Sequence, residues 1–380
     1  MTDQPGFLSR LFISGSVAFV LIGIVGALYG VALPAFARAY GLAEGEAGLI
    51  LTTHAGGAVA AVLAATLGLP GLGARTATAL IAAGAAGVAL MPGWPVTLAA
   101  SSVIGAGFGL IATEVNRAFL SGFGARGPGM VGLVNGISGG GLVAGPLLFV
   151  LAGGSIPAVY GGVALLAAAL ILTFDPAPPA AGRETAPPRR RPGWRLGILL
   201  LNHFAVCLEA ALAGLGVTAL IAAGWDEQGA ATLAAGFFAA FLLARVALYW
   251  ITRHVAADLL FLIAAAGTAL SAGVAALGFP AAGYVAAGGF VGLSFPAFFV
   301  WGARLLGADA RMSAAILLSG LLGLALGPLV IGAILRETGV QALFAVVAIA
   351  AGGLTLAILA TIGPSRRAIA RHDAMAVRTA

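Results

Sequence analysis

Residues 141–146 read Gly-Leu-Val-Ala-Gly-Pro, and residues 323–328 read Gly-Leu-Ala-Leu-Gly-Pro. The two copies lie 182 residues apart, and the same shift places Met130 on Met312. Small residues four positions apart let helix backbones approach closely in a membrane, and a proline kink is tolerated there. Glycine-rich helices give chance matches, but the shared proline and methionine positions indicate an internal repeat. We therefore expect equivalent packing or gating roles for Gly141, Gly145, Pro146, Gly323, Gly327 and Pro328.

The composition identifies the environment of these segments. Of the 380 residues, 61% are hydrophobic and 8% are charged, and the mean hydropathy is +1.08. A typical soluble domain has about 25% charged residues. The chain has too few polar side chains to cover a folded body in water, and its single cysteine, Cys207, excludes a disulfide-stapled fold. We therefore predict a polytopic membrane protein.

Twelve apolar runs approach the roughly 20 residues that a helix needs to cross a bilayer. Glycine, proline and charge clusters separate the runs, as in Leu69-Pro70-Gly71. The third and sixth runs are the shortest. We predict an all-α protein with twelve transmembrane helices, over residues 10–33, 46–68, 76–92, 96–119, 129–152, 156–174, 195–222, 230–251, 256–278, 281–303, 312–335 and 340–363.

The basic residues are all arginines, and their placement predicts the orientation. If the N-terminus is cytoplasmic, fifteen arginines fall on the cytoplasmic side, whereas only Arg38 and Arg336 fall outside and Arg117 and Arg245 fall within spans. This bias follows the positive-inside rule. The net charge of +6 is therefore a topology signal, since nucleic-acid binding needs a continuous basic face. We predict a multi-pass protein in the lipid of a bacterial-type inner membrane, with both termini cytoplasmic.

One polar stretch divides the spans into six and six. It runs from Asp175 to Arg195 and holds six prolines and the run Arg189-Arg190-Arg191. Repeated proline cannot continue a helix through lipid, so residues 175–195 are predicted to form an extended cytoplasmic linker. An N-terminal six-helix bundle would occupy residues 1–174, and a C-terminal bundle with a short cytoplasmic tail would occupy residues 196–380. Two such pseudo-symmetric bundles form an alternating-access carrier with its site at mid-membrane.

Several stretches of the chain resemble the major facilitator superfamily (MFS) of transporters. The stretch Gly26-Ala-Leu-Tyr-Gly30-Val-Ala-Leu-Pro34 is similar to the first helix of that family, and Glu46-Ala-Gly-Leu-Ile50 to the start of its second helix. Residues 141–146 are similar to the family's fifth-helix signature, which is often associated with antiporters, although Phe149-Val150 stand where two glycines are usual. The resemblance covers nearly the whole chain and implies the MFS fold and secondary transport.

Glu209 is the leading candidate for a functional residue. It lies near the middle of the seventh predicted span, where a charge costs roughly 2.5–3.5 kcal/mol on insertion scales, so that it must face a cavity or a partner. Poor solvation favours the neutral form of a carboxyl group, which would let Glu209 load and release a proton in the physiological range. We expect it to couple proton movement or to bind substrate. A structural carboxyl hydrogen-bonded between helices is the alternative.

Two arginines and a second glutamate also lie within predicted spans. Arg245 cannot deprotonate, so it would pair with Glu209, hold an anionic substrate, or extend toward the cytoplasmic headgroups. Glu114 and Arg117 are three residues apart and share one face of the fourth span. Glu114 is a second candidate for proton coupling, and Arg117 is a second candidate for substrate binding. A salt bridge that opens during transport and a simple pair near the membrane surface both fit this spacing.

Five polar residues complete the candidate substrate site. Asn116 and Asn135 would hydrogen-bond a solute or join helices. His54 would relay protons or stay neutral between helices, and Tyr29 fits a cavity wall or an interface belt. His203 shares a helix face with Cys207, but two ligands do not make a metal site, and no metal is predicted.

The function predicted from these residues is secondary transport. We find no P-loop and no zinc-protease pattern, so we expect neither an enzyme nor a cofactor, and the energy must come from a gradient. We predict a monomer that moves a small polar organic solute, such as a carboxylate or a sugar, by alternating access with proton symport or antiport. One alternative is a proton-driven exporter of amphiphilic compounds, which would need a broad aromatic cavity. The other is a non-transporting assembly or sensor protein, for which the best support is the absence of the family's usual aspartate from loop 68–75.

Overall fold

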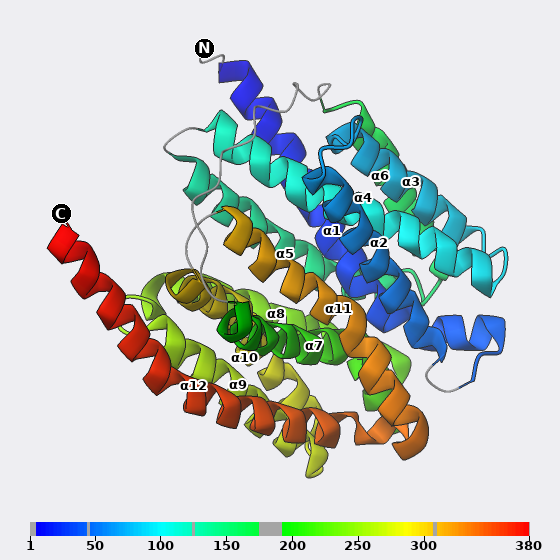
Figure 1. The fold of residues 1–380 in the computed structure, drawn as a ribbon. Helices are drawn as coiled ribbons and strands as arrows, with labels where there is room; N and C mark the ends of the chain where they lie inside the picture. Colours follow the sequence, from blue (N-terminus) through cyan, green and yellow to red (C-terminus); the bar gives the residue numbers. More distant parts are fainter. Residues whose placement is uncertain (1–4, 44–45, 124–125, 175–191, 307–309, 380) are drawn as a thin grey trace.

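Twelve long α-helices account for nearly all of the chain that the structure describes, which confirms the predicted all-α fold (Figure 1). The structure is a computed structural model, and it describes residues 5–43, 46–123, 126–174, 192–306 and 310–379. The first six helices are α1 (Pro5–Tyr40), α2 (Leu49–Thr66), α3 (Ala74–Ala89), α4 (Trp94–Gly122), α5 (Gly127–Leu151) and α6 (Ile156–Ile171). The second six are α7 (Pro192–Ala222), α8 (Glu227–Ile251), α9 (Ala257–Ala276), α10 (Pro280–Leu306), α11 (Ala310–Thr338) and α12 (Leu343–Thr379). Short 3-10 helices, η1 (Glu46–Gly48) and η3 (Val340–Ala342), precede α2 and α12.

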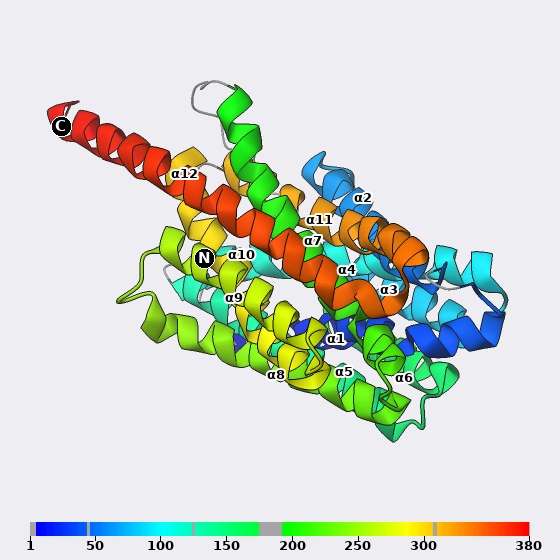
Figure 2. The same cartoon turned by 90° about the horizontal axis from the view of Figure 1, so that it is seen from below.

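The predicted linker, 175–195, lies outside the described residues except for its last four positions, which are the first turn of α7. Figure 2 shows that α12 extends beyond the other helices at its C-terminal end.

Ten helices in the described part of the chain are long and apolar enough to cross a membrane. The other two, α3 and α6, have 16 residues each and coincide with the two shortest predicted spans. Large apolar side chains also cover the outside of the molecule: Leu165, Leu270 and Ile349, all within helices, are 75%, 73% and 76% exposed. Such residues are stable on an outer surface that contacts lipid.

Residues that cannot continue a helix set the short breaks between helices. Gly278 has a φ of +108°, which glycine adopts without strain, and Pro280 begins α10 two residues later. Ser155 caps α6, because its hydroxyl oxygen accepts a hydrogen bond of 3.3 Å from the backbone N–H of Ala158. The turns therefore follow from local chemistry that is visible in the sequence.

Equivalent helices pair in the same way in the two halves. In the first half α1 packs on α5, α2 on α4, and α3 on both α4 and α6. In the second half α7 packs on α11, α8 on α10, and α9 on both α10 and α12. Across the halves, α5 packs on α8, α2 on α11, and α1 on α7. The result is the pseudo-symmetric pair of six-helix bundles that the repeat predicted.

The glycines of the repeated motif lie at these helix contacts. A Cβ added to Gly141 would overlap the carbonyl oxygen of Val20 in α1, and one added to Gly323 would lie 2.5 Å from the carbonyl oxygen of His203 in α7. Gly145 and Gly327 meet the next turns of the same two helices, at Ile24 and Cys207 respectively. Pro146 and Pro328 follow inside α5 and α11. The two copies therefore serve one purpose, which is close backbone contact.

A second set of contacts extends the repeat. Gly105 in α4 packs against the backbone of His54 in α2, and Gly288 in α10 packs against the backbone of Phe237 in α8. Each residue of the second pair comes 183 residues after its equivalent in the first pair. This correspondence shows which positions of the two halves are equivalent.

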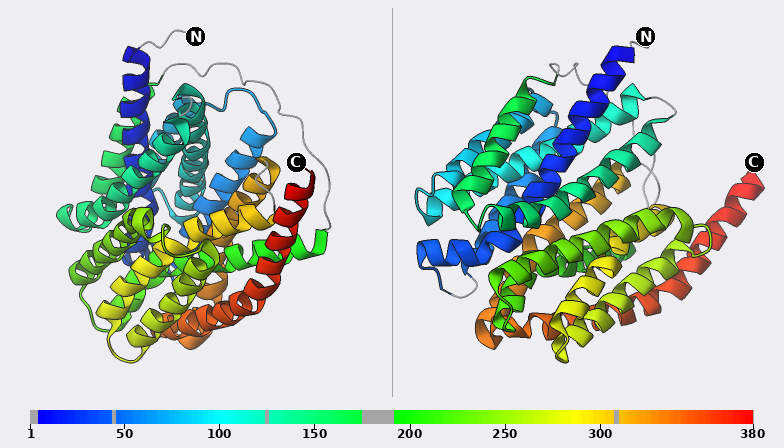
Figure 3. Two further views of the ribbon diagram at one scale, coloured as in Figure 1. Left: turned by 90° about the vertical axis from the view of Figure 1, so that its left-hand side faces the viewer. Right: turned by 180° about the vertical axis from the view of Figure 1, so that it is seen from behind.

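The halves meet at the end of the molecule opposite the chain termini, and we name these two ends the closed end and the terminal end. At the closed end Arg38, near the end of α1, forms an ion pair with Glu227, at the start of α8, with an Nη2–Oε2 distance of 2.9 Å. Toward the middle, Gly30 in α1 packs directly against the backbone of Ala213 in α7. Toward the terminal end the helices of the two halves diverge (Figure 3).

Candidate functional site

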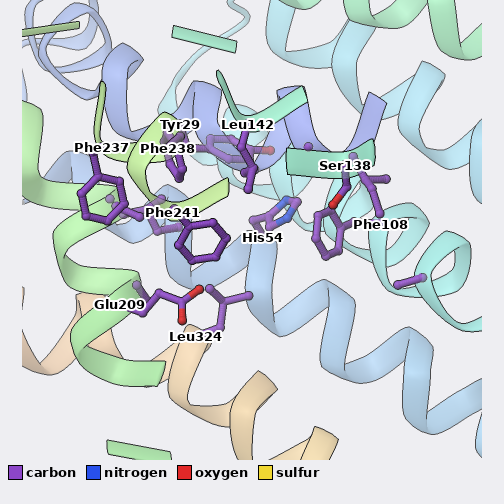
Figure 4. Close-up of a pocket in the computed structure, with 18 of the residues that line it drawn as sticks. Tyr29, His54, Phe108, Ser138, Leu142, Glu209, Phe237, Phe238, Phe241 and Leu324 are labelled. Carbon is purple, nitrogen blue, oxygen red and sulfur yellow. The ribbon is translucent and has the colours of Figure 1, made fainter. Parts of the chain in front are cut away.

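A cavity of about 320 Å³ lies between the two halves. Helices α1, α2, α4 and α5 line it from one side, and α7, α8 and α11 line it from the other (Figure 4). The lining is mostly apolar, and its aromatic part is a cluster of five phenylalanines, Phe19, Phe108, Phe237, Phe238 and Phe241. The polar side chains that line it are Tyr29, His54, Asn135, Ser138, Glu209 and Arg245. This volume is at the lower end of the range for small-molecule sites.

Glu209 extends from α7 into this cavity, beside Leu324 of α11 (Figure 4). It occupies the position equivalent to Gly26 of α1, 183 residues earlier, which also lines the cavity. No hydrogen-bond donor reaches its carboxylate among the residues that the structure describes. The carboxylate is therefore available to a proton, a water molecule or a solute, as a structural carboxyl bonded between helices would not be.

Arg245 lies on α8 and contributes the opposite charge. Its Nε donates a hydrogen bond of 3.4 Å to the carbonyl oxygen of Gly292 in α10, and its Cζ lies 4.2 Å from the centre of the Phe241 ring. The guanidinium and the Glu209 carboxylate interact electrostatically. They form no direct ion pair within 4.0 Å in the described part of the chain. The two charges therefore interact through space without a direct contact.

His54 faces these charges from α2. It is buried, and its ring lies 4.9 Å from that of Tyr29 and 5.3 Å from that of Phe108, measured between ring centroids. Its Nδ1 has no hydrogen-bond partner among the described residues. Because a buried polar atom is costly without a partner, His54 and the adjacent Tyr29 are suited to hold water or a solute group.

Asn135 and Ser138 form the α5 wall. The Asn135 amide donates hydrogen bonds to Asn116 Oδ1 in α4, at 3.1 Å, and to the carbonyl oxygen of Val131, at 2.8 Å. The Ser138 hydroxyl donates to the carbonyl oxygen of Asn135 at 2.7 Å. Asn116 is not part of the lining. It holds the Asn135 amide in place, so the carbonyl oxygen of that side chain remains available to a ligand.

Three other predicted residues lie away from the cavity. Glu114 and Arg117 form an ion pair with each other on α4, as their spacing indicated, and neither lines the cavity. His203 faces α11, where its Nδ1 lies 3.2 Å from the carbonyl oxygen of Ser319 and its Nε2 lies 3.6 Å from Cys207 Sγ. The structure thus brings together Tyr29, His54, Asn135, Glu209 and Arg245, and leaves these three elsewhere.

The phenylalanine cluster and Ser138 were not among the predicted site residues. Three members of the α8 wall, Phe237, Phe241 and Arg245, are spaced four residues apart and share one helix face. Phenylalanines at this spacing from an intramembrane arginine are the sequence feature that could have indicated a cavity wall. It was inconclusive, because phenylalanine also packs in cores and faces lipid.

Comparisons with known proteins identify the fold. No family model matches the sequence, and no curated protein matches it. Among solved structures the chain is similar to a D-xylose–proton symporter, with 11% identity and a TM-score of 0.74 over 92% of this chain and 97% of that chain. A POT-family transporter in complex with a thioalcohol-conjugated peptide matches with 13% identity and a TM-score of 0.75, over 95% and 96% of the two chains.

The fucose–proton symporter of E. coli matches with 17% identity and a TM-score of 0.60, over 91% of this chain and 97% of that chain. All three similarities extend over nearly the full length of both chains. Because the sequence identities are 11–17%, these similarities establish the fold alone. The chain has the fold of the major facilitator superfamily transporters.

Proposed function

We propose that the protein is a secondary transporter that moves a small organic solute across a membrane by alternating access, with Glu209 as the site of proton coupling. The observation that carries this proposal is an intramembrane carboxylate without a hydrogen-bond donor in the described part of the chain, in a cavity between two pseudo-symmetric halves. A charge in such a place is stable only when water or a ligand reaches it.

The contacts between the halves support alternating access. Toward the closed end from the cavity, Gly30 packs on the backbone of the lining residue Ala213, and the Arg38–Glu227 ion pair joins the halves farther along α1. The arginine bias assigns the terminal end to the cytoplasm, so the arrangement corresponds to a carrier that faces inward. Rocking the halves about the α1–α7 contact would close the terminal end and open the other.

The position of Glu209 favours it over Glu114 as the proton site. Glu114 is already paired with Arg117 outside the cavity, whereas Glu209 faces the cavity and an arginine at a distance. Protonation of Glu209 would change the net charge that a bound solute meets, which is the requirement for coupling the two.

Reconstitution into liposomes tests this function. Proteoliposomes with an internal pH indicator would be given a hexose, a nucleoside, a dipeptide, an aromatic carboxylate or an aromatic amine, and proton movement would be recorded. We expect at least one of these probes to move protons with wild type. Glu209→Gln should retain exchange of that probe but lose its pH-driven accumulation.

Glu114→Gln is the matched control, because it removes an equivalent charge outside the cavity. It should accumulate the probe as wild type does. Unchanged pH-driven accumulation by Glu209→Gln would exclude Glu209 as the proton carrier. If none of the probes moved protons with wild type, the transporter proposal would be contradicted.

The phenylalanine cluster favours one further candidate function, which is proton-driven export of amphiphilic compounds. Five aromatic rings in a small cavity suit a solute with an apolar body. Transport direction separates the two: an exporter would release protons inward against solute movement outward, and its solute would compete with protons at Glu209. Solute and proton moving in the same direction would contradict this second candidate.

A further inference from the structure

The two charged residues of the cavity differ in what a proton does to them. Glu209 accepts a proton, whereas the guanidinium of Arg245 stays charged under all physiological conditions. When both are ionised their charges cancel. When Glu209 is protonated, the cavity carries one uncompensated positive charge on Arg245. The ligand that this state accommodates best is therefore an anion with a single charge.

The geometry of Arg245 leaves it free to bind such an anion. Of its N–H groups only Nε has an acceptor among the described residues, the carbonyl oxygen of Gly292. Its flat face is covered by the ring of Phe241 at 4.2 Å. The terminal nitrogens on the cavity side remain unpaired in the described part of the chain, and their planar fork matches a carboxylate.

Among the residues that the structure describes, no other charge near Glu209 would compensate Arg245. On neighbouring helices the ionisable groups that line the cavity are Arg245 of α8, His54 of α2 and Tyr29 of α1. Tyr284 of α10 packs at Gly216, two turns farther along α7. From α11 the lining residues are the apolar Leu324 and Pro328, and no described residue of α10 or α12 lines the cavity.

The other residues that line the cavity indicate the chemical character of the rest of the ligand. Phe237, Phe238 and Phe241 form one wall next to Arg245, and Phe19 and Phe108 lie on the opposite half. Asn135, Ser138 and His54 offer neutral hydrogen-bonding groups. A neutral sugar carries no negative charge to compensate Arg245. A cationic amine would place a second positive charge near Arg245, and the two like charges would repel each other.

We propose that the substrate is a small monocarboxylate with an aromatic or branched apolar body, whose carboxylate binds the Arg245 guanidinium when Glu209 is protonated. This inference rests on the proposed transport function and specifies its substrate class. The proton and the anion together leave the net charge of the cavity unchanged, so the loaded carrier crosses its occluded state without additional buried charge. Substrate and proton therefore bind together, as symport requires.

Thermal stabilisation of the purified protein tests the substrate class, with 3-phenylpropionate as the probe. The comparison compounds are 3-phenylpropanamide, which is neutral, 3-phenylpropylamine, which is cationic, and acetate, which lacks the ring. We expect 3-phenylpropionate alone to raise the unfolding temperature, and to do so more at pH 6 than at pH 8. Equal stabilisation by the amide or the amine would overturn the inference.

Substitutions of Arg245 and Glu209 test whether 3-phenylpropionate binds at these residues. Arg245→Gln should weaken the apparent affinity for 3-phenylpropionate by about ten- to a hundredfold, since it loses charged hydrogen bonds. Arg245→Lys should have an intermediate effect, because it keeps the charge and loses the fork. It also serves where Arg245→Gln fails to fold, as judged by gel filtration and unfolding without ligand. Glu209→Gln imitates the protonated form and should bind the probe with no pH dependence.

Retained affinity in both arginine variants would contradict the role of Arg245. The two proposals fail in different ways. If a hexose or an amine drives Glu209-dependent proton uptake and 3-phenylpropionate does not, the proposed substrate class is wrong and the proposed transport function is supported. If 3-phenylpropionate binds through Arg245 but no probe moves protons, the transport proposal fails.

Discussion

Tyr160 and Tyr40 place hydroxyl groups in different settings within the first half. Tyr160 is fully buried, with its ring 5.8 Å from that of Tyr29 and 6.0 Å from that of Phe36, and its hydroxyl has no hydrogen-bond partner among the described residues. The Tyr40 hydroxyl shares a 2.7 Å hydrogen bond with the hydroxyl of Thr97. Burial of a polar atom costs free energy unless a hydrogen bond compensates it. The two tyrosines should therefore respond in opposite ways to loss of the hydroxyl.

We predict that Tyr160→Phe raises the free energy of unfolding by about 1 kcal/mol, because it removes an unpaired buried hydroxyl. Tyr40→Phe is the matched control and should lower that energy by about the same amount, because it breaks a hydrogen bond. Thermal unfolding in detergent measures both. If Tyr160→Phe destabilises the protein as Tyr40→Phe does, an ordered water holds the Tyr160 hydroxyl.

At the scale of the helix, glycines with the same sequence spacing have different roles. Gly141 of α5 lies against the backbone of α1, so that an added Cβ would overlap the carbonyl oxygen of Val20. Gly132 and Gly136, also four residues apart on α5, have open space where a Cβ would be. The pairs Gly141–Gly145 and Gly132–Gly136 both match the small-residue pattern. Only the structure shows that the first pair lies at a helix contact and the second does not.

We predict that Gly141→Ala destabilises the protein by about 1–3 kcal/mol, the usual range for overpacking. Gly132→Ala on the same helix should be neutral or mildly stabilising, because alanine has the higher helix propensity and meets no neighbour. Unfolding temperatures of the two variants test this contrast. Equal effects would show that α5 does not need a close contact with α1.

For the molecule as a whole, an exposed ion pair joins the two halves at the closed end. The Arg38–Glu227 ion pair is well exposed, with side chains that are 60% and 45% accessible. An exposed ion pair stabilises a structure by about 0–1 kcal/mol. The pair therefore favours contact between the halves at the closed end without preventing their separation. A carrier needs this balance, because both of its end states must be accessible.

We predict that a covalent link at this place stops transport. Arg38→Cys with Glu227→Cys, made in a Cys207→Ser background and joined by a short bifunctional thiol reagent, should hold the closed end shut. Solute flux in proteoliposomes should fall to background and return when the link is reduced. Either single cysteine treated in the same way should transport normally. Full flux through the linked protein would show that the halves do not separate there.

Most of the architecture was predictable because a bilayer restricts the choices. Each span needs about 20 apolar residues with internal hydrogen bonds, and the twelve predicted spans coincide with α1–α12 to within a few residues except at extended ends such as that of α12. The repeated motif predicted two equivalent halves, and its glycines do lie at equivalent helix contacts. The orientation in the membrane and the linker stay predictions.

The candidate site was predictable only in part. The cost of charge in lipid pointed to Glu209 and Arg245, and both line the cavity. The same argument selected Glu114 and Arg117, which instead pair with each other on α4. These helices are apolar on all sides, so their sequences do not show which face is turned toward the centre.

The amino-acid sequence was enough to predict a polytopic membrane protein with twelve helices in two related halves, because apolar length and repeated small residues act locally along the chain. Which polar residues share one cavity became visible only in the folded arrangement of the helices. The fold places Glu209 and Arg245 on one side of the cavity and His54 and Asn135 on the other, and five phenylalanines from both halves complete the lining. The reason is that the rotation and tilt of each helix depend on packing against its neighbours, and that information belongs to no single segment.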